Sequence, residues 1–190
     1  SRGARGDRRD PRKARARFFQ DRLNMPAPRD AALARLAARV GRRLRAGGAR
    51  IVTVESCTGG YLAKCLTDLS GSSDYFDRGW VTYSNAAKQK LLGVSPALLE
   101  RHGAVSGPVA LAMARGALRS AGATVAVSVT GIAGPTGATP GKPVGTVWIA
   151  WARRQRGRVR ARAAHHHFRG DRDTVRRRTV AAALSGLLSP

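Results

Sequence analysis

The apolar and polar positions of the chain form alternating helical and strand-like patterns. From Asp30, which can cap a helix, apolar residues recur at helical spacing until Gly47 ends the pattern. Short apolar runs at residues 50–55 and 125–129 are instead typical of strands that are buried on both faces. The other expected strands lie at residues 78–84, 145–152 and 157–168, and the other expected helices begin near residues 61, 85, 96, 107 and 172.

This alternation of strands and helices predicts an α/β protein. The expected fold is a three-layer α/β/α sandwich around a mostly parallel or mixed sheet of about five strands. Residues 157–168, in which arginine alternates with apolar residues, are expected to form a half-exposed edge strand. We assign residues 29–190 to this domain. Residues 1–28 are a basic extension that is expected to be disordered, because it lacks apolar periodicity.

The chain carries a net charge of +24, much of it from arginine at residues 1–24 and 151–178. Such a surplus favours an anionic partner, which can be a nucleic acid or a small phosphorylated molecule. A generally arginine-rich composition is the alternative explanation. Only 5% of the residues are aromatic, so a surface on which nucleic-acid bases stack is not indicated. Nucleic-acid binding through the basic ends is therefore the weaker interpretation.

The two cysteines, Cys57 and Cys65, have neither the spacing of a zinc site nor the pattern of a disulfide framework. A reducing cytoplasm is the simplest location for such a chain. No apolar run reaches the length of about 18 residues that a membrane-spanning helix needs. The sequence therefore predicts a cytoplasmic protein with no metal, no cofactor and no membrane partner.

Residues 55–60 read Glu-Ser-Cys-Thr-Gly-Gly and lie where an apolar strand gives way to a helical pattern. A serine in such a turn, here Ser56, presents its hydroxyl beside the N–H groups at the start of a helix. Those donors can bind a phosphate or stabilise a developing oxyanion. The same arrangement can also be only a tight turn that a hydroxyl caps.

A second glycine-rich loop, at residues 130–137, follows another buried strand, and a third strand ends at Tyr83, shortly before Lys88. Ligands of open α/β sheets bind beyond the carboxyl ends of the strands. If these three strands run in the same direction, Ser56, Tyr83, Lys88 and Thr130 share one crevice.

These side chains form a plausible catalytic set. A serine needs a base to become a nucleophile, and histidine is scarce in this chain. A desolvated lysine can act as the base, and a tyrosine can relay the proton. Taken alone, Lys88 is more often an exposed helical lysine and Tyr83 a core residue. Cys57 is a rival nucleophile, although a buried neighbour of Ser56 is the favoured interpretation.

Several sequence blocks occur in one order that matches a known family. They are Glu55-Ser56-Cys57-Thr58-Gly59-Gly60, Val81-Thr82-Tyr83-Ser84-Asn85 with Lys88, Leu91-Leu92-Gly93-Val94, Gly103-Ala104-Val105-Ser106, Thr130-Gly131-Ile132-Ala133-Gly134-Pro135, Lys142-Pro143-Val144-Gly145-Thr146-Val147 and Gly170-Asp171-Arg172. Over about residues 30–188 the chain resembles the CinA C-terminal domain family. Active members of this family are nicotinamide-nucleotide amidases, and the family tends toward oligomers.

The resemblance implies a metal-independent amidohydrolase that converts nicotinamide mononucleotide to nicotinic acid mononucleotide and ammonia in pyridine nucleotide salvage. It implies that Ser56 is the nucleophile and that Tyr83 and Lys88 move the proton. The residues implied in substrate binding are Glu55, Thr58, Gly59, Gly60, Thr130, Gly131, Ala133, Gly134 and Arg172. The oxyanion would lie on N–H groups of the 58–60 turn or from Gly131 onwards, and Arg172 would bind the substrate phosphate. A homodimer is expected.

Two other functions stay open at this stage. The glycine loops can hold a nucleotide without turnover, in a competence- or damage-linked binding module. The arginine-rich ends can instead bind nucleic acid, which predicts an affinity that falls steeply with salt.

Overall fold

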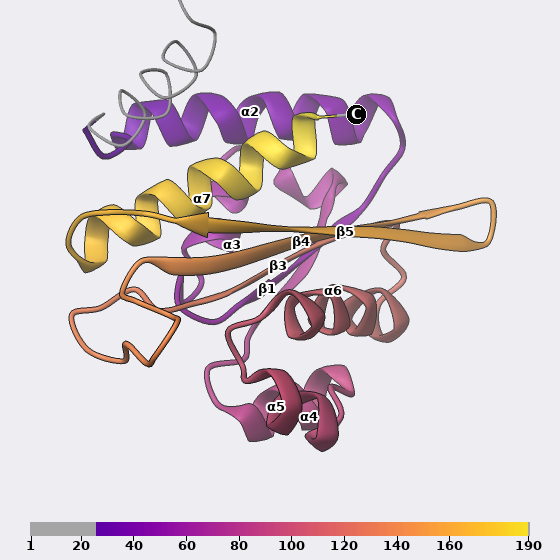
Figure 1. The fold of residues 1–190 in the computed structure, drawn as a ribbon. Coiled ribbons are helices and arrows are strands. Elements are labelled where there is room, and N and C mark those ends of the chain that lie inside the picture. The colour runs from indigo at the N-terminus through magenta and orange to yellow at the C-terminus, as the bar shows by residue number, and fades with distance from the viewer. Residues whose placement is uncertain (1–25, 190) are drawn as a thin grey trace, which may run out of the picture.

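The computed structural model describes residues 26–189 and consists of a five-stranded sheet with helices on both faces (Figure 1). The strand order is β2-β1-β3-β4-β5. The strands are β1 (Ile51–Glu55), β2 (Phe76–Val81), β3 (Val125–Gly131), β4 (Thr146–Gln155) and β5 (Arg158–His167). The helices are α2 (Asp30–Ala46), α3 (Tyr61–Thr67), the 3₁₀ turn η1 (Ser72–Asp74), α4 (Asn85–Leu92), α5 (Pro96–His102), α6 (Gly107–Ser120) and α7 (Arg172–Leu188). The predicted α/β sandwich with a mixed sheet is confirmed. Most of the 1–28 extension lies outside the described residues.

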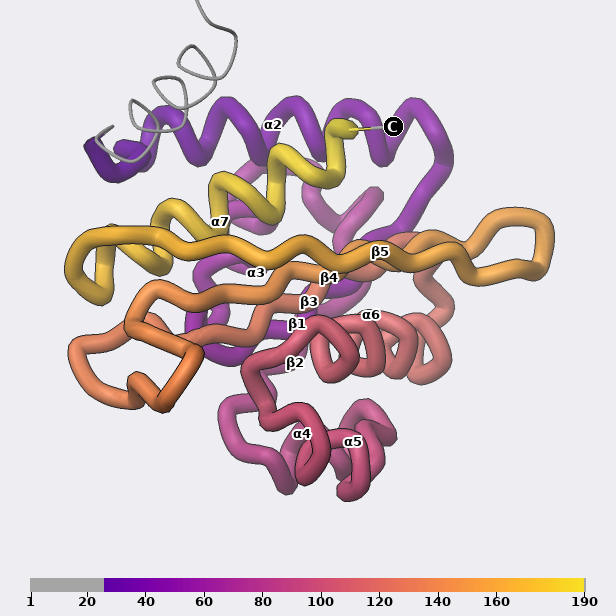
Figure 2. The backbone as a smooth tube through the Cα atoms, viewed as in Figure 1, coloured from indigo at the N-terminus to yellow at the C-terminus, as the bar shows by residue number. Residues whose placement is uncertain are grey.

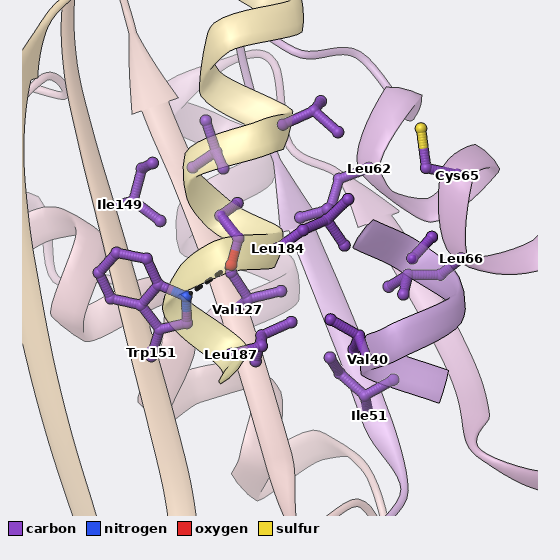
Figure 3. Close-up of a cluster of buried hydrophobic side chains, with 14 of the residues drawn as sticks. Val40, Ile51, Leu62, Cys65, Leu66, Val127, Ile149, Trp151, Leu184 and Leu187 are labelled. Atoms are coloured by element: carbon purple, nitrogen blue, oxygen red, sulfur yellow. Dashed lines mark hydrogen bonds between the residues drawn. The ribbon is translucent and has the colours of Figure 1, made fainter. Parts of the chain in front are cut away.

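The helices form two layers. Helices α2, α3 and α7 cover one face of the sheet, while α6 covers the other and α4 and α5 lie beyond it (Figure 1). Each layer buries its own apolar core against the sheet. In the first core, the indole of Trp151 points from β4 toward α7, where its Nε1 donates to the carbonyl of Ala183 at 2.9 Å (Figure 3). Burial on both faces explains why β1 and β3 consist of continuous apolar runs.

Strands β1, β2 and β3 all end at the same edge of the sheet. Strand β1 pairs in parallel with β2 and with β3, whereas β4 is antiparallel to β3 and β5 is antiparallel to β4. The loop at residues 132–145 and the start of α7 lie at this edge, and the β4–β5 turn lies at the opposite end (Figure 2). The expectation that the three strands before the candidate residues run in one direction is therefore confirmed.

Several boundaries differ from the prediction, among them those of α2, β2 and β3. Asp30 is the first residue of α2 and not its cap, and its carboxylate instead forms an ion pair with Arg177. Strand β2 ends at Val81 because Ser84 already caps α4, with its hydroxyl accepting from the next turn. Strand β3 extends to Gly131, so the first residues of the second glycine-rich segment belong to the sheet.

Gly116 provides a test of how tightly α4 packs on α6. A Cβ at this position would lie 2.1 Å from the carbonyl oxygen of Leu92, a backbone atom that cannot rotate away. We expect Gly116→Ala to lower the free energy of unfolding by about 1–3 kcal/mol, because the overpacking outweighs the better helix propensity of alanine. Urea denaturation measures the difference. The control is Gly122→Ala, which meets no atom within 4 Å and should leave stability nearly unchanged. Equal stability of both variants would contradict this packing.

Candidate active site

Ser56 is the first residue after β1, and the sheet holds its backbone in place. Its N–H donates to the carbonyl of Val129 on β3 at 3.0 Å. The chain then turns through Gly59 and Gly60, whose φ angles of 58° and 94° favour glycine, into helix α3. The side chain of Ser56 is largely buried, with 9% of its surface exposed. The predicted strand-to-helix turn is therefore present.

Glu55 supports this turn from inside the protein. It is fully buried, and its carboxylate accepts hydrogen bonds from the N–H groups of Gly60, Leu62 and Ala63 at 3.1, 3.0 and 2.8 Å. A carboxylate at a helix N-terminus is stabilised by these donors and by the helix dipole. The carboxylate of Glu55 is thus bound by three backbone N–H groups, and a direct contact between Glu55 and the substrate stays a prediction.

The same contacts change which N–H groups are available to a ligand. Gly60 donates to Glu55 at 3.1 Å, and Gly59 donates to the carbonyl of Ser56 at 3.0 Å. These two donors, expected at the oxyanion, are therefore already used within the turn. The N–H groups of Thr58, Ala133 and Gly134 find no acceptor among residues 26–189.

Lys88 lies on α4 but points inward, with only 1% of its surface exposed. Its Nζ lies 2.7 Å from the carbonyl oxygen of Thr82, 3.5 Å from that of Tyr83 and 3.4 Å from Oγ of Ser56. Burial lowers the pKa of this amine below its ordinary value. Among the described residues no carboxylate forms an ion pair with it. The exposed-lysine interpretation is therefore wrong.

These three contacts suit a neutral amine. An uncharged Lys88 has two N–H donors and one lone pair, and the carbonyls of Thr82 and Tyr83 can only accept. When these carbonyls take the two donors, the lone pair faces the hydroxyl of Ser56. The 3.4 Å separation is long for a hydrogen bond, as is common for catalytic pairs without substrate. Ser56 and Lys88 can thus act as nucleophile and base.

The phenol of Tyr83 has a different neighbour. Its side chain is 60% exposed, and its hydroxyl accepts a hydrogen bond from Arg172 at 2.8 Å. The other guanidinium nitrogen of Arg172 donates to the carbonyl of Gly134 at 2.7 Å. Tyr83 therefore approaches Lys88 through its backbone carbonyl, while Arg172 of α7 links its phenol to the carbonyl of Gly134 in the 132–145 loop.

Arg176 is a site residue that we did not predict. It lies one turn after Arg172 on α7, so both guanidinium groups lie on the same side of the helix. Its terminal nitrogen donates to the carbonyl of Thr58 at 2.8 Å, directly beside the serine turn. Its Nε and the hydroxyl of Thr58 are buried without a partner among residues 26–189. The four-residue spacing from Arg172 was the only signal in the sequence.

Cys57 does not have the character of a nucleophile. Burial raises the pKa of its thiol to about 12, outweighing the opposite effect of Arg172 and Arg176. At neutral pH almost none of it is thiolate, the reactive form. The interpretation of Cys57 as a buried neighbour of Ser56 is therefore the better one.

The second glycine-rich segment lies on the other side of Ser56. Thr130 is buried, and its hydroxyl donates to the carbonyl of Ala104 at 2.8 Å, which joins β3 to the loop before α6. Gly131 ends β3, and Ala133 and Gly134 are buried beyond it. The peptide bond after Gly134 is cis. This segment therefore lies beside the serine turn at the ends of the strands. The hydroxyl of Thr130 is used to join β3 to the loop before α6.

The part of the chain that the structure describes contains no group of three or more His, Cys, Asp or Glu side chains that could hold a metal ion. The histidine run at residues 165–167 lies on the edge strand β5, separated from β1 by β3 and β4. Among residues 26–189, no helix has both the length and the apolar character needed to cross a membrane.

Comparison with known proteins identifies the family. The model of the CinA C-terminal domain matches residues 33–189. A nicotinamide-nucleotide amidohydrolase PncC from Escherichia coli K12 is 51% identical over 158 residues, which cover 83% of this chain and 94% of that protein. A protein of the same name from Pseudomonas putida is 51% identical over 153 residues, which cover 80% of this chain and 93% of that protein. The crystal structure of competence/damage inducible protein CihA from Agrobacterium tumefaciens has a TM-score of 0.79 and 42% identity, covering 86% of this chain and 97% of that chain. The chain therefore belongs to the CinA C-terminal domain family.

Proposed function

We propose that this protein is a nicotinamide-nucleotide amidohydrolase that converts nicotinamide mononucleotide and water to nicotinic acid mononucleotide and ammonia. The observation that carries the proposal is the buried amine of Lys88, 3.4 Å from the hydroxyl of Ser56 at the ends of three parallel strands. A serine beside a desolvated lysine suits acyl transfer from an amide. The name of the relatives that are 51% identical supports the same reaction.

In the first half of the reaction, Oγ of Ser56 attacks the carboxamide carbon and its proton passes to Nζ of Lys88. The tetrahedral intermediate then expels ammonia, which takes the proton from Lys88. This leaves an ester between Ser56 and the nicotinate carboxyl group. In the second half, water attacks the ester, Lys88 accepts the proton of the water, and Ser56 recovers it on release of the acid.

Two sets of N–H groups are suited to stabilise the oxyanion. Thr58 lies two residues after the nucleophile, and Ala133 and Gly134 lie in the segment after β3; all three N–H groups lack an acceptor among residues 26–189. A donor of this kind contributes about 10²–10³-fold in rate. We assign the oxyanion to these groups, in place of the N–H groups of Gly59 and Gly60.

Arg172 and Arg176 are suited to the substrate phosphate. Both extend from the first turns of α7, and guanidinium groups bind phosphate in bidentate geometry. Tyr83, which accepts a hydrogen bond from Arg172, keeps its own O–H free for the substrate or the departing ammonia.

The decisive assay follows ammonia release from nicotinamide mononucleotide by the wild-type protein, with chromatographic identification of nicotinic acid mononucleotide. Nicotinamide riboside, which lacks the phosphate, is the matched substrate. We expect kcat/KM to be about 10- to 100-fold lower for the riboside, since hydrogen bonds to a charged group contribute about 1.5–3 kcal/mol. Binding of nicotinamide mononucleotide without product would contradict the amidase and favour the nucleotide-binding module.

Three further expectations stay predictions. They are the homodimer, the cytoplasmic location and the lesser role of nucleic acid as a partner of the basic ends. Sedimentation of the full chain measures the first of these directly.

A further inference from the structure

A cavity lies at the opposite end of the sheet from Ser56. It has a volume of about 500 Å³ and lies between the β4–β5 hairpin and the C-terminal parts of α2 and α7. Val125, the first residue of β3, forms part of its lining, whereas the turn of Ser56 lies beside the last residues of β3. At about 3.3 Å per residue, the two places are about 16 Å apart along the strand. The cavity is therefore separate from the candidate active site.

Four arginines line this cavity, and the lining contains no aspartate or glutamate. Arg153 on β4 pairs directly with Arg160 on β5, and Trp151 pairs with Arg162 one step further along the same face. Arg43 approaches from α2. Like charges directly opposite each other destabilise a pair of strands. The fold thus holds a repulsive pair at the mouth of a cavity.

The positive charge of this cluster is not balanced within the described protein. None of its four arginines forms an ion pair with a residue in the range 26–189. The side chain of Arg43 donates a hydrogen bond to the carbonyl of Leu188, and the side chain of Arg162 donates one to the carbonyl of Gly186 at 2.7 Å. The C-terminal end of α7 therefore holds both arginines in position. The guanidinium groups of Arg153 and Arg160 have no hydrogen-bond partner among the described residues. These two side chains are free to bind an anion.

The floor of the cavity is apolar and partly aromatic. Trp151 is 8% exposed there, and the guanidinium group of Arg162 lies 4.3 Å from the centre of its ring. Val125 and Leu187 line the floor beside it. Arginine planes and apolar side chains together offer stacking and contact surfaces to a flat ring. The volume is in the range of pockets that bind small molecules.

We propose that this cavity is a second binding site, which takes a small ligand carrying two or more phosphate groups, such as a nucleoside polyphosphate. Arg153 and Arg160 bind the phosphates in bidentate geometry, and the ligand replaces the repulsion between them with attraction to a shared anion. The proposal does not rest on the amidase function, because no residue of the cavity belongs to the candidate active site.

The test is isothermal titration calorimetry with ATP and with inorganic pyrophosphate. The cavity variant carries Arg153→Gln and Arg160→Gln. The control variant carries Arg35→Gln and Arg39→Gln, which remove the same charge from an exposed stretch of α2 outside the cavity. We expect the wild type and the control to bind ATP alike and the cavity variant to bind at least about tenfold more weakly, as for the loss of charged hydrogen bonds. If ATP binds more tightly than pyrophosphate, the site recognises the nucleoside as well as the phosphates. If the two bind equally, the site recognises the phosphates alone. Either result supports the proposed site.

Three outcomes would overturn the proposal. The first is that neither probe binds to the wild type, and the second is that ATP binding weakens equally in the cavity and control variants. The third is that nicotinamide mononucleotide displaces ATP from the Ser56→Ala protein, which would locate ATP at the active site. The cavity variant should unfold at the same or a higher temperature than the wild type, since it removes a like-charge pair. A thermal melt therefore distinguishes weaker binding from misfolding.

Discussion

Replacement of Ser56 by alanine is expected to lower kcat for nicotinamide mononucleotide by about 10⁴–10⁶-fold, as loss of the nucleophile does in other serine hydrolases. The N–H donors beside Ser56 and the arginines of α7 are unchanged in this variant, so KM should change little. The fold should also be retained, because the side chain of Ser56 makes its one described contact with Lys88. Product formation under single-turnover conditions measures the chemical step directly.

The neighbouring Cys57 provides the matched control. Its thiol is neutral because burial raises its pKa to about 12, so Cys57→Ala should keep activity within a few-fold of the wild type. Ser56→Ala with near-normal turnover would exclude Ser56 as the nucleophile. A folded Cys57→Ala protein without activity would transfer that role to the thiol.

Replacement of Lys88 by methionine is expected to lower kcat by about 10²–10⁴-fold, the range that general acid–base catalysis contributes. Methionine has a similar length but neither accepts the proton of Ser56 nor returns it to ammonia. Lys88→Arg should be similarly inactive, because a guanidinium stays protonated and offers no lone pair. The control is Lys90→Met, which changes an exposed lysine of the same helix and should leave activity unchanged.

Lys88 also determines the expected pH dependence. Burial favours the neutral amine, so its pKa lies below the ordinary value of 10.5. Wild-type kcat/KM should rise as Lys88 loses its proton and level off above this lowered pKa. The folded pKa is below the unfolded one, so the contribution of Lys88 to stability is complete above about pH 10.4 and is lost as the pH falls through the folded pKa. A flat wild-type profile, or the same rise in the residual activity of Lys88→Met, would contradict the assignment of the base.

Local patterns were sufficient for the architecture. Continuous apolar runs identified β1 and β3 because a strand covered on both faces has no polar side. Helical spacing identified α2 because one side of it packs on α3 and α7. The motif at residues 55–60 located the serine turn because its two glycines adopt the backbone conformation that the turn requires. Boundaries such as Asp30 were less accurate, since a helix can start one residue either way from its capping signal.

The electrostatic character of the site, by contrast, depends on contacts between distant segments. The amine of Lys88 is buried because α4 places it against carbonyls at the end of β2, and nothing in the helix sequence indicates this. The carboxylate of Glu55 faces inward because the first N–H groups of α3 lie next to it. Arg176 contacts Thr58, 118 residues earlier in the chain, because α7 packs beside the turn that follows β1. By itself the sequence determined which segments form strands and helices and which side chains are chemically capable, because these depend on near neighbours. Only the tertiary structure decided which of those side chains lose water and meet, because desolvation and proximity arise when the whole chain packs.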